Sequence, residues 1–239
     1  MAGLLKLIKA QTQVALRNKQ IILCYYIIPL IFFFIFGAVL VKMDASAKES
    51  LPVSMTIFSI SMGTLLGLSE SINSLMKVEY FKAFYVMNVR IYKIILAEQI
   101  SCGIHMIVQS CLIIILSRIF FDSGLLFQNT KCIFALFLYL IFVILVSSII
   151  GLIAKGKNVV MVLGQLCFFI TVFLGGIMFP ISFLPELLQK IANVIPASMV
   201  ISIRDNIDEY AFYKLALSVL LTLMMYVGAY WLKLKFNKE

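Results

Sequence analysis

Charged residues are scarce in this 239-residue chain, where Asp, Glu, Lys and Arg together make up 13%. A soluble domain typically has about twice that share. The chain also has one histidine, which excludes a metal cluster built on histidines, and five cysteines, an odd number without CxxC spacing. We therefore expect neither a disulfide scaffold nor a catalytic constellation, and the chain is predicted to be no enzyme and to hold no cofactor or metal of its own.

Apolar residues, by contrast, make up 63% of the sequence, including 20 Phe. One globular core could not hide so much apolar surface from water. The apolar residues form runs of about 20, the length of a membrane-spanning helix, and the runs show no alternation typical of a barrel. The sequence thus predicts an all-α integral membrane protein with a single transmembrane domain over residues 1–239. Its six expected spans are residues 21–41, 53–72, 94–117, 132–154, 159–179 and 213–232.

The net charge of +9 would raise the question of nucleic acid in a soluble protein. Here the basic residues fall in short clusters between the apolar runs, so no nucleic-acid partner is expected. With six spans both termini lie on one side, and that side carries 13 of the 20 Lys and Arg. The other seven are matched by seven acidic residues. The positive-inside rule therefore predicts cytoplasmic termini.

Residues 1–20 precede the first span and combine basic and apolar side chains at helical spacing. The apolar positions are Leu4, Leu5, Ile8, Thr12 and Ala15, and the basic ones are Lys6, Lys9 and Arg17. This pattern favours an amphipathic interface helix on the inner membrane surface. A frayed basic tail is the alternative.

The loop of residues 73–93 after the second span is predicted to be a cytoplasmic coupling element. Phe81, Phe84 and Tyr85 stand three and four apart, so they share one face of a short helix with basic flanks. Such a face docks on lipid headgroups or in a protein groove, and the sequence leaves both open. The candidate coupling residues are Lys77, Glu79, Phe81, Lys82, Phe84, Tyr85 and Arg90.

Residues 175–207, before the last span, are too apolar for a solvated loop and too rich in proline for another span. We expect a re-entrant helical hairpin that enters from the outer face. An amphipathic helix lying on the outer leaflet is the alternative. The candidate gate residues are Phe179, Pro180, Phe183 and Pro185.

Polar side chains interrupt the third span at intervals of four, three and four, which puts them on one helical face. They are Glu98, Cys102, His105 and Gln109. Ionisable groups in a span usually face protein or a water-filled cavity. Glu98, His105 and Gln109 therefore line either a translocation path or a subunit interface, or they form internal hydrogen bonds between helices. Span 2 adds a groove of small residues, Ser59, Gly63, Gly67 and Ser71, suited to close helix packing.

The segment Gly151–Asn158 nearly matches a phosphate-binding loop. Asn158 stands where the motif needs a Ser or Thr hydroxyl for magnesium, and the segment joins two spans instead of a strand and a helix. We therefore expect no nucleotide site there.

Over nearly its whole length the chain resembles the permease subunits of type 2 ABC transporters. Four stretches carry the resemblance in order: Arg17-Asn18-Lys19 before a span with Pro29 and Gly37, the loop from Glu79 to Val89, Gly175-Gly176 to Pro180 with Leu184-Pro185, and Ile195-Pro196 with Arg204. The sequence departs from the family pattern at Glu79-Tyr80, where Gly-Thr is common, and at Asn88, where Pro is common.

The resemblance implies the membrane subunit of an ATP-driven exporter in the plasma membrane. Two permease subunits, as a homo- or heterodimer, would pair with two copies of a separate ABC ATPase, which would bind ATP and magnesium. The cargo implied is an amphipathic or hydrophobic compound such as an antibiotic, a peptide, a lipid or a lipid-linked glycan. The alternative function is an ion- or proton-coupled secondary carrier that uses Glu98 and His105.

Overall fold

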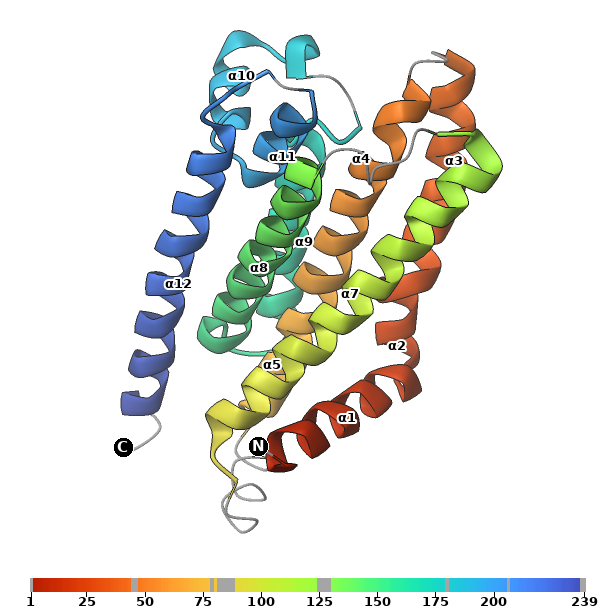
Figure 1. The fold of residues 1–239 in the computed structure, drawn as a ribbon. Coiled ribbons are helices and arrows are strands. Elements are labelled where there is room, and N and C mark those ends of the chain that lie inside the picture. Colours follow the sequence, from red (N-terminus) through yellow and green to blue (C-terminus); the bar gives the residue numbers. More distant parts are fainter. Residues whose placement is uncertain are drawn as a thin grey trace.

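The computed structural model describes residues 2–43, 47–77, 80, 89–123, 130–178, 181–205 and 207–236, and every element in these ranges is helical (Figure 1). Six described segments are long and apolar enough to cross a membrane, which confirms the expected number of spans. They are Lys19–Lys42, Lys48–Leu75, Ile91–Phe121, Thr130–Ile153, Lys157–Leu174 and Ala211–Lys233.

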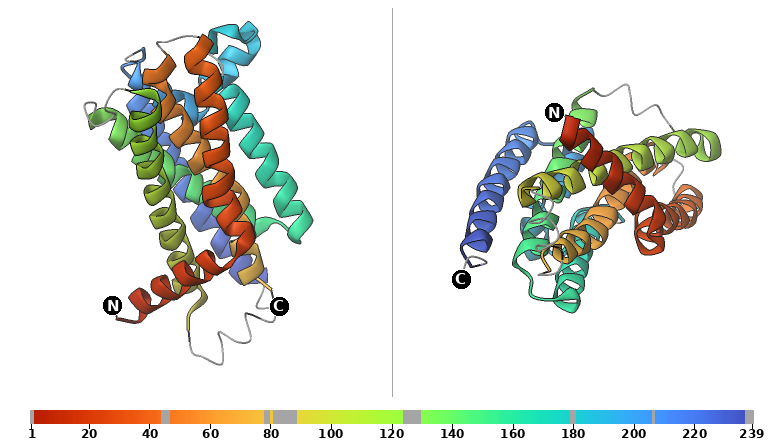
Figure 2. Two further views of the ribbon diagram at one scale, coloured as in Figure 1. Left: turned by 90° about the vertical axis from the view of Figure 1, so that its right-hand side faces the viewer. Right: turned by 90° about the horizontal axis from the view of Figure 1, so that it is seen from below.

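The first helix, α1 (Ala2–Arg17), lies across the lower end of the bundle and does not continue into the first span (Figure 2). The chain turns at Asn18, whose side chain accepts a hydrogen bond of 3.0 Å from the backbone N–H of Gln20 and so caps the next helix. The first span then consists of α2 (Lys19–Ile22), the π-helical turn η1 (Leu23–Ile27) and α3 (Ile28–Met43). The second consists of α4 (Ala47–Met62), the π-helical turn η2 (Gly63–Leu68) and α5 (Ser69–Leu75).

The remaining spans are single helices. They are α7 (Ile91–Phe121), α8 (Thr130–Ile153), α9 (Lys157–Leu174) and α12 (Ala211–Phe236). Between α9 and α12 lie η4 (Ile181–Phe183), α10 (Glu186–Ala192) and α11 (Pro196–Arg204), at the upper end in Figure 1. The start of α1 and the end of α12 both lie at the lower end, as an even number of spans requires.

Span 2 is the centre of the bundle. Its most apolar stretch is 94% buried, against 17% to 44% for the other five. Small residues allow the neighbours to approach this closely: an added Cβ at Gly63 would meet the side chains of Met106 and Tyr25, and one at Gly67 would meet Tyr25. The groove of small residues predicted on span 2 is thus filled from within the same chain. The close approach of spans 1 and 2 also places the two π-helical turns, η1 and η2, against each other.

Several helix ends differ from the expected span limits; span 2, for example, begins at Ala47 instead of residue 53. Two of the differences have clear local reasons. α9 ends at Leu174, before the expected limit at 179, because Gly175 and Gly176 follow and Gly176 has a φ of +74°. α7 extends past 117 to Phe121 and ends at Asp122, which adopts a left-handed conformation with a φ of 48°. Its 31 residues make α7 the longest helix described.

Candidate functional site

At the lower end of the bundle, α1 packs along α7, which begins beside it (Figure 2). The face of α1 turned toward the protein contains Leu4, Leu7, Ile8, Gln11, Thr12 and Ala15. The Thr12 hydroxyl lies 3.1 Å from the Ser101 hydroxyl of α7, so one polar contact fixes the register of the two helices. Lys6, Lys9 and Arg17 lie on the exposed side, and Leu5, expected on the apolar face, is 67% exposed.

A groove of about 530 Å³ opens between α1 and the first turns of α7. Its lining is mainly apolar, with two lysines at its rim: Gly3, Leu4, Lys6, Leu7, Val89, Tyr92, Lys93 and Leu96. Val89, Tyr92 and Lys93 lie within the expected coupling loop of residues 73–93, whose last three residues already belong to α7. The groove could therefore receive an apolar side chain next to that segment.

The predicted coupling residues fall largely outside the described part of the chain. Glu79, Phe81, Lys82, Phe84 and Tyr85 lie outside the described residues. Lys77 is exposed just after α5, and Arg90 is exposed at the N-terminal cap of α7. These two basic side chains bracket the segment at the lower end of the bundle.

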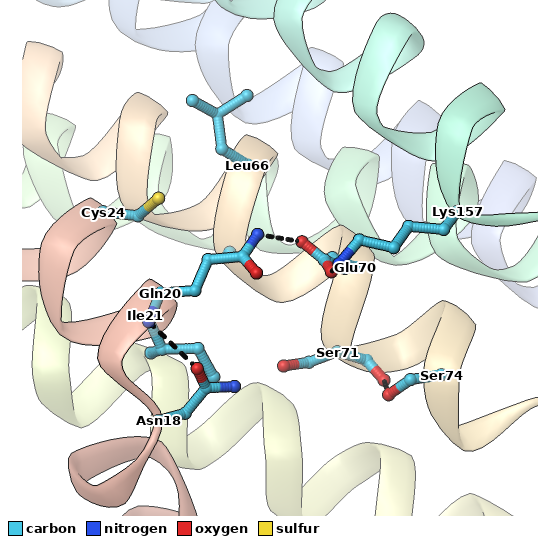
Figure 3. Close-up of a pocket in the computed structure, with 10 residues that line it drawn as sticks. Asn18, Gln20, Ile21, Cys24, Leu66, Glu70, Ser71, Ser74 and Lys157 are labelled. Atoms are coloured by element: carbon cyan, nitrogen blue, oxygen red, sulfur yellow. Dashed lines mark hydrogen bonds and ion pairs between the residues drawn. The ribbon is translucent and has the colours of Figure 1, made fainter.

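A polar cluster that the sequence did not reveal joins three spans at the same end (Figure 3). The Glu70 carboxylate of α5 lies 2.5 Å from the Lys157 ammonium of α9 and accepts a hydrogen bond of 2.5 Å from the Gln20 amide of α2. The three side chains face a cavity of about 210 Å³ that is also lined by Asn18, Ile21, Cys24, Leu66, Gly67, Ser71 and Ser74. The Glu70 side chain is only 21% exposed, so this ion pair is partly shielded from solvent.

The segment that resembles a phosphate-binding loop has a structural role here. Gly151 lies so close to span 2 that an added Cβ would be 2.7 Å from the Ser69 carbonyl oxygen. Gly156 makes the turn between α8 and α9 with a φ of +94°. The lysine that would contact a phosphate, Lys157, instead pairs with Glu70, so the residues of the near-match are accounted for by packing and by this ion pair.

The polar residues of span 3 lie inside the protomer. Glu98, Cys102, His105 and Gln109 are at most 7% exposed, and they face the first two spans. The Tyr26 hydroxyl of η1 lies 2.7 Å from His105 Nδ1, and Ser71 is within hydrogen-bonding reach of Glu98. On the adjoining face the Gln99 amide donates a hydrogen bond of 2.8 Å to the Ser148 hydroxyl of α8. Two side chains of the stripe, Glu98 and His105, therefore contact polar groups of other helices in the same chain.

At the upper end, α10 and α11 form a pair bent by 88°. α11 is buried against α8, α12 and α4, whereas α10 lies at the edge, where Leu187 is 71% exposed. The Ser198 hydroxyl bonds the Ile195 carbonyl at 2.7 Å and so stabilises the bend. Of the predicted gate residues, Phe183 is 76% exposed and Pro185 is exposed, while Phe179 and Pro180 lie outside the described residues.

The connection from α11 to α12 carries an exposed ion pair. The Lys214 ammonium lies 2.7 Å from Asp208, and the Tyr210 backbone N–H donates a hydrogen bond of 2.8 Å to the same carboxylate. These two donors lower the pKa of the Asp208 carboxyl below its usual value. We therefore assign this ion pair a structural role only. Within the described ranges no group of three His, Cys, Asp or Glu side chains could hold a metal ion.

Comparison with known proteins identifies the family to which this chain belongs. Residues 3–206 match the family model described as ABC-2 type transporter, from α1 through α11. The comparison with curated proteins gave no match. The family consists of transmembrane permease components that lack a nucleotide-binding domain and generally pair with ABC ATPase subunits. The match covers well over half of the chain, and the chain therefore belongs to the ABC-2 type transporter family as a multi-pass membrane permease.

Proposed function

We propose that this chain is the permease subunit of an exporter that moves an amphipathic or hydrophobic compound outward, driven by a separate ABC ATPase. The observation that carries the proposal is the arrangement at the lower end. There α1, the ends of the 78–88 segment and the first turns of α7 lie together, so a partner bound at this end would act directly on the longest span. ATP and magnesium belong to the ATPase in this proposal.

In this proposal the lower end faces the cytoplasm, where basic residues are enriched. Lys6, Lys9, Lys77, Arg90 and Lys93 all belong to this end. Their positive charge suits contact both with anionic lipid headgroups and with an acidic patch of an ATPase. α1 serves as the interface helix, and residues 73–93 serve as the coupling loop.

The complex contains two permease subunits and two ATPase copies. Support for a second permease comes from spans that are poorly covered within one chain: the most apolar stretch of α12 is 17% buried, that of α9 22% and that of the first span 28%. α3 and α9 flank the same side of the bundle (Figure 2). Both helices expose apolar side chains that suit contact with lipid or with a second subunit, including Ile31, Ile35, Val162, Leu166 and Phe173.

The bent pair α10–α11 acts as the re-entrant element of the outer face. The burial of α11 supports this role, because its helix lies between spans instead of on the surface. The exposed apolar residues of α10 and its flanks, Phe183, Leu187 and Val194, suit the lipid headgroup boundary or a closed outer gate.

Co-expression with the ABC ATPase encoded beside it tests the proposal. The purified complex should hydrolyse ATP and should transport an amphipathic substrate into inside-out vesicles. Phe84→Asp should abolish co-purification, because a charge on an apolar docking face must be desolvated on binding. The matched control is Phe183→Asp, which places the same charge at the opposite end and should leave the ATPase bound.

Two results would refute the proposal. One is transport by the purified chain alone under an ion or proton gradient without ATP, which would establish a secondary carrier. The other is an ATPase complex that is equally stable with Phe84→Asp and with Phe183→Asp, which would place the docking surface elsewhere.

A further inference from the structure

The seam between α4 and α7 contains polar atoms that the protein itself does not satisfy. His105 Nε2, Gln109 Nε2 and Oε1, Ser59 Oγ and Thr56 Oγ1 are buried and have no hydrogen-bond partner among the described residues. The four residues are between 0% and 4% exposed. A buried polar atom without a partner is costly in any protein, and in a membrane no lipid can replace the missing partner.

These atoms share one place, as the register of the two helices shows. α4 and α7 run antiparallel, with Gly63 opposite Met106 and with Met55 packed in one apolar cluster with Ile113. Ser59 lies midway between Gly63 and Met55, and Gln109 lies midway between Met106 and Ile113, so the two are level.

Helical spacing also places the four side chains on facing surfaces. Ser59 and Thr56 are four and seven residues from Gly63, on the face of α4 that meets α7. Gln109 is four residues after His105, on the face of α7 that meets α4 and η1. All four lie inside the candidate spans Lys48–Leu75 and Ile91–Phe121, and Thr56, the nearest to an end, follows Lys48 by about two helical turns.

The seam offers both donors and acceptors. The Gln109 amide contributes one of each, the Ser59 and Thr56 hydroxyls can act as either, and none of the four side chains is a carboxylate or an ammonium.

We infer that the seam between α4 and α7 binds a chain of internal water molecules that bridges His105, Gln109, Ser59 and Thr56. Internal waters typically make about three hydrogen bonds to buried polar groups, and this mixture of donors and acceptors matches them. Calcium or magnesium fits less well, because each takes six or more oxygen ligands and here three side-chain oxygens lie beside two nitrogens. A larger ligand would need an opening that side chains at most 4% exposed do not provide.

Radiolytic footprinting of the full chain in lipid nanodiscs tests the inference, because hydroxyl radicals formed from bound water oxidise adjacent buried side chains. Met106 and Met55 are a matched pair, with exposed fractions of 0% and 1%. Met106 lies beside Gln109 in the seam, whereas Met55 lies among Phe33, Leu51 and Ile113. We expect oxidation of Met106, little of Met55, and loss of the Met106 signal in Gln109→Leu.

Thermal unfolding of the same variants gives an independent readout. If waters bridge the seam, Gln109→Leu breaks the network and lowers Tm by ~2–4 °C or more. If the atoms are unsatisfied, the same substitution removes their cost and leaves Tm unchanged or higher. Gln99→Leu, which removes the hydrogen bond to Ser148, is the control for loss of an amide with a known partner.

If Gln109→Leu does not fold, Ser59→Ala replaces it in the test, because this substitution removes only one hydroxyl. Ser59→Ala should likewise lower Tm and reduce the oxidation of Met106. The inference is overturned by equal oxidation of Met106 and Met55, or by a Tm at or above that of the wild type in the seam variants.

Discussion

Three glycines of the spans allow a graded test of how tightly span 2 is enclosed. An added Cβ at Gly164 of α9 would lie 2.5 Å from the Leu65 carbonyl oxygen, well inside van der Waals contact with backbone. At Gly63 it would also come within 2.5 Å, but of the flexible end of the Met106 side chain. At Gly103 of α7 the nearest atom is the Ile144 Cδ1 at 3.6 Å, an ordinary contact.

The expected effects of substitution to alanine follow from these contacts. Each alanine gains ~0.5–1 kcal/mol from the lower backbone entropy of the unfolded chain and from helix propensity. Gly103→Ala should show this gain alone. Gly164→Ala should lose ~1–3 kcal/mol to overpacking, because α9 must move away from span 2, and the net effect is destabilising. Gly63→Ala should fall between them, since Met106 can change rotamer.

Thermal unfolding of the purified chain in one detergent measures the series. At ~2–4 °C per kcal/mol for a chain of this size, Gly103→Ala should raise Tm by a few degrees and Gly164→Ala should lower it. Equal Tm values for Gly164→Ala and Gly103→Ala would show that α9 does not approach the span 2 backbone. A Gly63→Ala variant as damaged as Gly164→Ala would refute the claim that side-chain and backbone contacts differ.

Three further predictions concern single polar contacts. Tyr26→Phe should lower stability by ~0.5–1.5 kcal/mol in thermal unfolding, because it removes the hydrogen bond to the buried imidazole of α7, and an unchanged Tm would contradict that bond. A double-mutant cycle of Glu70→Gln and Lys157→Met should give a coupling of ~0.2–1 kcal/mol that weakens with salt, whereas additive effects would show that the ion pair is not formed. Because the folded pKa of Asp208 is lowered, its ion pair stabilises the fold fully above its unfolded pKa of ~3.9, and the contribution is lost as pH falls through the folded pKa. Lys214→Met should therefore lower Tm near neutral pH and have little effect in strong acid, and an equal effect at both pH values would contradict the pairing.

The number and approximate positions of the spans were predictable because each apolar run of the sequence is about 20 residues long, as a bilayer requires, and few charges interrupt it. The end of α9 was not, since the apolar run continues beyond Leu174 and only the Gly176 backbone conformation stops the helix. The filling of the span 2 groove by Tyr25 was likewise hidden, because it depends on the π-helical turn η1 that brings this ring to Gly63 and Gly67.

The candidate site was less accessible to sequence reasoning. Glu70 lies near the end of span 2, but its partners Gln20 and Lys157 come from other spans, and no local pattern encodes a pairing over that separation. The stripe on span 3 was recognisable from its spacing. The sequence left open whether it faced a path, a partner or its own chain, because helical periodicity gives a face but not the neighbour that covers it.

The short turn between α8 and α9 has a consequence for how these helices can move. Only Ala154, Lys155 and Gly156 join them, so the lower ends of α8 and α9 cannot separate in any conformational change. The Asn73 amide of α5 donates hydrogen bonds of 3.1 and 2.8 Å to the carbonyls of Gly151 and Ala154 beside this turn. The lower end of span 2 is therefore held to the same point, and a movement of α8 and α9 there has to carry span 2 with it or break these two bonds.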